Sequence, residues 1–144
     1  MDGMIQFPDL NHTCQTKMKY LIDTHILIWV ISEDQKLRSK HLEIISDDEN
    51  EIILCSASIW ELTIKFSIGK LEILKTLDDI FVKIKKSKIQ VLEMEERDFL
   101  VLASLPFFHK DPFDRAIISM ARSRNMTVIS EDQYFEFYDI QLVK

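Results

Sequence analysis

The stretch KYLIDTHILIWVI (19–31) decides the fold. Its first part, KYLID (19–23), is a short apolar run that is typical of a buried strand and ends on an acid. The second part, THILIWVI (24–31), follows without a linker and is predicted to form a helix. We therefore expect Asp23 to stand where the first strand ends and the first helix begins.

The same alternation of strand and helix continues along the rest of the chain. Further strands are predicted at EIILCS (51–56), IQVLEM (89–94), MTVIS (126–130) and, as a last short one, IQLV (140–143). Further helices are predicted over 37–46, 58–68, 77–86, 95–105 and 111–124. This order predicts an α/β fold in which helices cover both faces of a central parallel sheet.

Two details refine the predicted helices. Leu42 and Ile45, with Leu37, are expected on one apolar face of the helix over 37–46, and Gly69 is expected to end the helix over 58–68. The helix over 77–86 carries a single apolar stripe, made of Leu77, Ile80, Phe81 and Ile84.

Length and composition favour one domain. The chain has 144 residues, of which 47% are hydrophobic, so it can bury a core of its own. Residues 1–17 are polar and aperiodic, and we expect them to form a flexible N-terminal extension. Residues 18–144 are expected to form the single folded domain.

Charge and cysteine content exclude several classes of protein. The net charge of −6 argues against a protein that binds nucleic acid mainly by neutralising phosphates. Cys14 and Cys55 form no CxxC pair and have no histidine at zinc-finger spacing, so Cys55 is expected to be a buried free thiol. No apolar run approaches the length of a membrane span, and no secretory signal opens the chain, so we expect the cytoplasm.

Four acids from distant parts of the sequence are expected at one edge of the sheet. Ligands of open parallel sheets bind beyond the carboxyl ends of the strands, where the following helices also begin. Asp23 ends the first strand, Glu61 and Asp114 are expected in the first turns of helices, and Asp132 follows the strand MTVIS. The sequence therefore predicts that these carboxylates converge.

Each acid also has a local structural interpretation. Ser58 and Glu61 fit a capping box, and Asp23 could cap the helix behind it. Asp111 fits the N-cap of the helix that starts with Pro112. Asp132 could be a turn residue.

A divalent cation would relieve the repulsion among carboxylates crowded at one site. Oxygen-rich sites favour Mg²⁺ or Mn²⁺, and such a cation can activate a water molecule and stabilise charge on a phosphodiester. Thr24 and Ser130 add hydroxyl groups near the same edge, and Lys65 and Arg115 could contact phosphate or pair with a neighbouring acid. His25 and His109 are expected to be neighbours of the site with structural roles. The sequence contains neither a GxSxG elbow nor a P-loop.

Four segments resemble the PIN-domain family, and within it the VapC-type toxin ribonucleases of type II toxin–antitoxin systems. They are LIDTHILIW (21–29), SASIWELTIKFSIGKLEI (56–73), LPFFHKDPFDRAIISMA (105–121) and TVISED (127–132). The resemblance covers residues 18–144. It implies a three-layer α/β/α sandwich and Mg²⁺- or Mn²⁺-dependent endonucleolytic cleavage of RNA.

The same resemblance implies site residues and partners. The family acids fall on Asp23, Glu61, Asp114 and Asp132, which would be both the catalytic residues and the metal ligands. Family hydroxyl positions fall on Thr24 and Ser130, while the cap role of Asp111 is a sufficient explanation for it. Members usually form homodimers and are silenced by an antitoxin. On this chain, a groove for the antitoxin would be lined by apolar residues that could equally belong to the core, namely Ile26, Trp29, Leu42 and Ile45.

Two other functions remain open at this point. A haloacid-dehalogenase-type phosphatase also places an aspartate after its first strand, but that class needs a second acid where this chain has His25. A PIN-like module that binds RNA or protein without cutting would be marked by the loss of an acid, and none of the four is lost.

Overall fold

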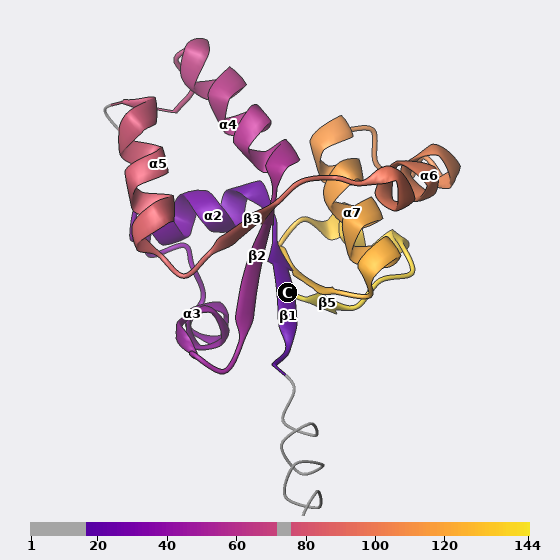
Figure 1. The fold of residues 1–144 in the computed structure, drawn as a ribbon, viewed down its shortest axis with the longest axis horizontal. Coiled ribbons are helices and arrows are strands. Elements are labelled where there is room, and N and C mark those ends of the chain that lie inside the picture. Colours follow the sequence, from indigo (N-terminus) through magenta and orange to yellow (C-terminus); the bar gives the residue numbers. More distant parts are fainter. Residues whose placement is uncertain (1–16, 72–75) are drawn as a thin grey trace, which may run out of the picture.

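A parallel sheet forms the centre of the computed structural model, which describes residues 17–71 and 76–144. Within these residues, five strands lie in the order β3-β2-β1-β4-β5 (Figure 1). The strands are β1 (Lys19–Ile22), β2 (Glu51–Cys55), β3 (Gln90–Leu92), β4 (Thr127–Ile129) and β5 (Leu142–Val143). All neighbouring strands pair in parallel, as the alternation of strand and helix predicted. The predicted extension, residues 1–17, lies outside the described residues except for Lys17.

Helices cover both faces of this sheet. They are α2 (Thr24–Ile31), α3 (Ser39–Ser46), α4 (Ser56–Ser67), α5 (Leu77–Lys86), α6 (Glu96–Ser104) and α7 (Pro112–Arg124). Figure 1 shows α2, α3, α4 and α5 on one side of the strands and α6 and α7 on the other, which confirms the three-layer α/β/α sandwich. A short 3-10 helix, η1 (Gln133–Phe137), was not predicted. Among the described residues, no helix has the length and apolar character needed to cross a membrane.

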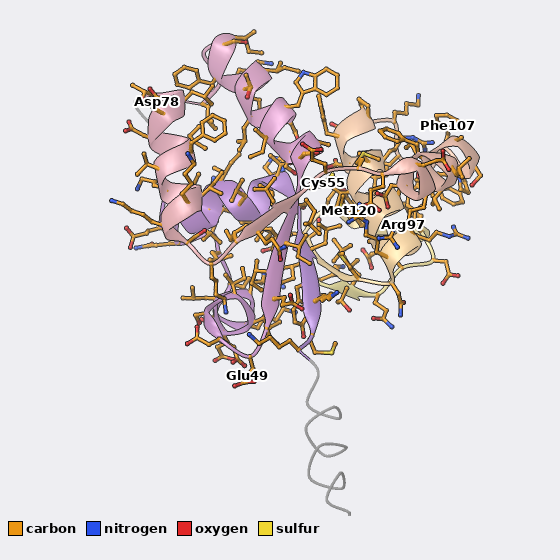
Figure 2. All side chains as sticks on the ribbon, in the orientation of Figure 1. Glu49, Cys55, Asp78, Arg97, Phe107 and Met120 are labelled. Atoms are coloured by element: carbon orange, nitrogen blue, oxygen red, sulfur yellow. The ribbon has the colours of Figure 1, made fainter. Side chains whose placement is uncertain are left out.

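Successive side chains of each strand alternate between the two faces of the sheet, so the strands contribute to the core on both sides. Ile22 and Leu54 lie in the apolar cluster on the side of α2 and α5, whereas Leu21 and Ile53 lie in the cluster on the side of α7. Successive side chains of a strand point to opposite faces of a sheet, so a buried parallel strand is apolar at every position. Cys55 is fully buried in the second cluster as a free thiol, as predicted, and lies inside the molecule in Figure 2. Cys14 lies outside the described residues.

The predicted inner face of the helix over 37–46 is wrong at Leu42. The side chain of Leu42 is 52% exposed, while His41 and Ile45 are buried. The helix begins at Ser39, and the pair His41 and Ile45, spaced by four residues, forms its inner face. Of the residues suggested to line a groove, Ile26 and Ile45 therefore belong to the core, and Trp29 packs against it.

Gly69 ends α4 as the sequence predicted. Its backbone has φ 74°, in the left-handed region that glycine adopts without strain. Its N–H donates to the carbonyl of Phe66, and the N–H of Lys70 donates to that of Lys65. These two bonds form a Schellman motif, which satisfies carbonyls that the end of the helix leaves free.

The strand order reverses between β1 and β4. The chain leaves β1 toward β2 on one side, and β4 joins β1 from the other side. The two strands end together, because the N–H of Asp23 donates to the carbonyl of Ile129 over 3.2 Å. Such a switch point opens a crevice beyond the carboxyl ends of the strands. We call this region, where β1, β2 and β4 end, the carboxyl edge of the sheet.

A buried ion pair joins α6 to the end of α7. The side chain of Asp98 is fully buried and accepts hydrogen bonds from Arg124 Nε at 3.2 Å and Nη2 at 2.6 Å. It also accepts from the N–H of Glu95 at 2.8 Å. Burial alone would raise the pKa of Asp98, but these hydrogen bonds outweigh burial and hold the pKa below its usual range.

We predict that Asp98→Ala lowers the free energy of unfolding by about 3 kcal/mol or more, because it removes the buried carboxylate that accepts two hydrogen bonds from the largely buried Arg124 guanidinium. Arg97→Ala is the matched control: Arg97 pairs with Glu95, and both side chains are more than half exposed. Its removal should cost less than about 1 kcal/mol. Urea denaturation measures both values, and similar losses for the two variants would contradict the assignment.

Candidate functional site

Asp23 lies buried at the junction of β1 and α2. It is the N-cap of α2, and its Oδ1 accepts a hydrogen bond from the N–H of Ile26 at 2.8 Å. Its Oδ2 accepts from the hydroxyl of Ser130, which follows β4. Burial raises the pKa of Asp23 despite these two bonds. One oxygen of Asp23 therefore caps α2, which is one of the two sequence interpretations. The other oxygen joins Asp23 to Ser130 at the carboxyl edge of the sheet.

Asp111 and Asp114 open α7 as the pattern DPFD predicted. Asp111 is the N-cap, and its Oδ1 accepts from the N–H groups of Phe113 and Asp114 at 2.8 and 3.0 Å. Asp114 follows in the first helical turn. The pKa of Asp114 is raised to about 8, first by burial and then by four neighbouring carboxylates, which are Asp111, Asp23, Glu61 and Asp132 in order of effect.

The acids that the sequence placed at this edge therefore converge around Asp114. We call these five carboxylates the acid cluster: Asp23, Glu61, Asp111, Asp114 and Asp132. Burial is the larger reason for the raised pKa of Asp114, and repulsion from the neighbouring carboxylates adds to it, because both oppose ionisation.

Glu61 reaches the cluster from α4, but not in the predicted way. The helix begins at Ser56, directly after β2, so Glu61 lies in the second turn and forms no capping box with Ser58. Its Oε2 pairs with Lys65 Nζ at 3.1 Å, one turn further along the helix. Its Oε1 is buried and has no hydrogen-bond partner among the described residues. A buried carboxylate oxygen without a partner is costly, and a cation would satisfy it.

Asp132 enters the cluster as the N-cap of η1. Its Oδ1 accepts from the N–H of Tyr134 at 2.9 Å. Its backbone N–H donates to Ser130 Oγ at 3.0 Å, and the same hydroxyl donates to Asp23. Ser130 thus joins two acids that stand after neighbouring strands, which agrees with the predicted supporting place of this hydroxyl.

His109 is the neighbour of the site that the sequence predicted, but its position between two of the acids was not predicted. Its Nε2 lies 2.8 Å from Asp114 Oδ2 and 3.1 Å from Asp132 Oδ2. Its Nδ1 accepts from the N–H of Asp111 at 3.3 Å, so the proton of the neutral ring belongs on Nε2. His109 therefore donates toward two carboxylates. The signal available in the sequence was its place two residues before the DPFD pattern.

The other two supporting residues act at a distance from the cluster. The hydroxyl of Thr24 is buried and donates to Ser58 Oγ at 2.9 Å, which ties α2 to α4. Arg115 forms no ion pair with Asp114 among the described residues. It donates instead to backbone carbonyls before α7, including those of Pro106 at 2.8 Å and Leu105 at 3.3 Å. Arg115 thus holds the segment that carries His109.

The donor set of the cluster fits a hard divalent cation. Its ligand atoms are carboxylate oxygens, the type that Mg²⁺ and Mn²⁺ prefer. One atom from each of His109, Asp114 and Asp132 lies within 4.8 Å of the others. His109 fits less well as a ligand, because the lone pair of its neutral ring already accepts from Asp111. The donor set therefore fits a cation held by the carboxylates better than one held by His109.

Comparison with known proteins agrees with this fold. One similar structure is a chain of the VapBC2 complex of Rickettsia felis, bound to a DNA fragment from its promoter, with 18% identity and a TM-score of 0.67 over 88% of this chain and 98% of that chain. Another is VapBC-1 of nontypeable Haemophilus influenzae, with 19% identity and a TM-score of 0.64 over 88% and 98%. A third is DNA-bound VapBC of Salmonella typhimurium, with 17% identity and a TM-score of 0.63 over 88% and 97%.

Sequence comparison gives the family directly. A search of curated proteins found no match. The family model of the PIN domain matches residues 20–140, which include every strand from β1 to β4 and the whole acid cluster. The chain belongs to the PIN domain family.

Proposed function

We propose that this chain is a Mg²⁺- or Mn²⁺-dependent endoribonuclease that acts as the toxin of a type II toxin–antitoxin pair. The observation that carries the proposal is the acid cluster, whose members come from four separate elements and which includes Asp114, whose pKa burial and the neighbouring carboxylates together raise to about 8. Structural frameworks rarely gather buried acids without pairing them, whereas functional sites do so to bind cations. PIN domains are generally nucleases, which supports a hydrolase role.

Different residues of the chain would have different roles in such a site. When bound, the divalent cation would activate a water molecule and stabilise charge on the phosphodiester. Asp114, Asp132, Asp23 and Glu61 would hold it with carboxylate oxygens, and the unpartnered Oε1 of Glu61 supports its place among them. Ser130 fixes the direction of the Asp23 carboxylate by donating to Oδ2. His109 keeps Asp114 and Asp132 at one spacing by donating toward both.

The toxin assignment rests on the sequence resemblance and on the fold. The structures with which the chain shares its fold include chains of VapBC complexes, which supports a cognate antitoxin as partner. RNA as substrate, a homodimer and the cytoplasm are parts of the same proposal. The alternative of a PIN-like module that does not cut is an outcome of the experiments that follow.

We expect the purified chain to cleave RNA in the presence of Mg²⁺ or Mn²⁺. Cleavage should stop when EDTA is added. Asp23→Asn removes one negative ligand and should lower the rate at least about a hundredfold. Asp78→Asn is the control, because Asp78 lies exposed at the start of α5 (Figure 2). The readout is cleavage of labelled RNA, with circular dichroism to confirm that each variant is folded.

Cleavage that survives EDTA, or that Asp23→Asn leaves unchanged, would contradict the metal-dependent mechanism. An absence of cleavage together with normal binding of RNA would favour the non-catalytic module.

Affinity for Mg²⁺ should depend on pH through Asp114. Because its pKa is raised to about 8, a proton competes with the cation for this carboxylate below that pH. The apparent affinity should therefore rise with pH up to about 8 and level off above it. Calorimetric titration between pH 6 and 9 measures this dependence. Asp114→Asn should bind more weakly and lose most of the dependence, and an equally steep rise in this variant would contradict the assignment to Asp114.

A further inference from the structure

Tyr134 is fixed to the acid cluster at two points. Its backbone N–H donates to Asp132 Oδ1 at 2.9 Å. Its ring packs against the ring of His109, with centroids 4.9 Å apart and planes inclined by 34°. The same His109 lies between the second oxygen of Asp132 and Asp114. The position of the tyrosine ring is thus set by the atoms that would surround a reacting phosphate.

Folding does not explain why this ring is open to solvent. Tyr134 is 45% exposed, whereas its neighbour Phe135 is completely buried and carries the contact of η1 with the core. Phe137, the next aromatic of η1, is also exposed, with its centroid 6.2 Å from that of Tyr134. An aromatic ring that is held in place while much of its surface stays accessible is suited to stacking against a planar ligand.

The charge of the chain points to the same kind of contact. A net charge of −6 and a cluster of carboxylates give little attraction for a polyanion beyond what the cation supplies. Contacts that are not ionic can add affinity for a nucleic acid at such a site, and stacking of bases on aromatic rings is a usual one. Tyr134 is the exposed aromatic residue joined directly to Asp132.

We propose that Tyr134 is a stacking platform for an unpaired base next to the phosphate that is cut. This inference rests on the proposed function, since it takes RNA as the substrate, and it adds the residue that holds a base beside the acid cluster. In a duplex the faces of the bases are covered by their neighbours, so a stack on Tyr134 requires an unpaired base. Tyr134 binds and positions the substrate, while the carboxylates act on the phosphate.

The test compares Tyr134→Ala and Tyr134→Leu, which remove the ring, with Tyr134→Phe and Tyr134→Trp, which keep it. KM and kcat are measured on a labelled random pool of single-stranded RNA with Mg²⁺. Loss of one stacked base should raise KM roughly tenfold while kcat changes little, and Phe or Trp should retain the wild-type KM. Phe99→Ala is the control, because Phe99 is a comparably exposed aromatic on α6.

Salt gives a second, independent readout. Binding of the same RNA pool is measured in the Asp23→Asn background between 50 and 200 mM salt. Affinity should fall by no more than about threefold, the change expected for one released counterion on a single strand. A duplex of the same length should compete poorly.

The outcomes separate this inference from the proposed function. If the wild type cuts RNA but Tyr134→Ala and Tyr134→Leu keep its KM, the platform is wrong and the nuclease stands. If Tyr134→Phe weakens binding as much as Tyr134→Ala, the hydroxyl acts and stacking is wrong. If the wild type does not cut RNA, the proposed function fails, and the binding measurement still decides: loss of RNA binding on removal of the ring supports the platform, and unchanged binding overturns it.

Discussion

Repulsion among carboxylates at the carboxyl edge of the sheet is the constraint on which the rest of this structure depends. Each backbone element delivers its acid by an ordinary local rule, such as an N-cap at Asp23, Asp111 and Asp132. The parallel sheet then brings the acids together, because strand ends and helix starts share one edge. The result is a partly buried site whose negative charge the folded chain does not balance by itself, and burial together with repulsion raises the pKa of Asp114 to about 8.

Neighbouring groups limit this repulsion without removing it. Ser130 and His109 donate toward three of the acids, and Lys65 pairs with Glu61. Arg115 carries a charge that could neutralise an acid, but it donates instead to backbone carbonyls and so holds the segment before α7. The chain therefore keeps a group of negatively charged side chains at the carboxyl edge of the sheet, which suits a cation better than a purely structural role would require.

Local patterns in the sequence were enough to predict the elements and most of the acids. The pattern DPFD predicts its own helix cap, and the apolar run before Asp23 predicts a buried strand. Predictions were wrong where packing overrides periodicity: His41, and not Leu42, faces the core, and α4 starts early enough to move Glu61 out of a capping box. The contact of His109 with Asp132, 23 residues away, joins distant parts of the chain, so the place of His109 before the DPFD pattern marked it only as a neighbour of the site.

Thermal unfolding of the metal-free protein tests the central claim most directly. If crowded carboxylates oppose folding, Asp114→Asn without metal at pH 9 should melt higher than the wild type, by at least about 3 °C for each kcal/mol of relieved repulsion. Mg²⁺ should raise the melting temperature of the wild type and raise that of Asp114→Asn much less. A metal-free Asp114→Asn that melts lower than the wild type, with no effect of Mg²⁺ on either protein, would contradict the account.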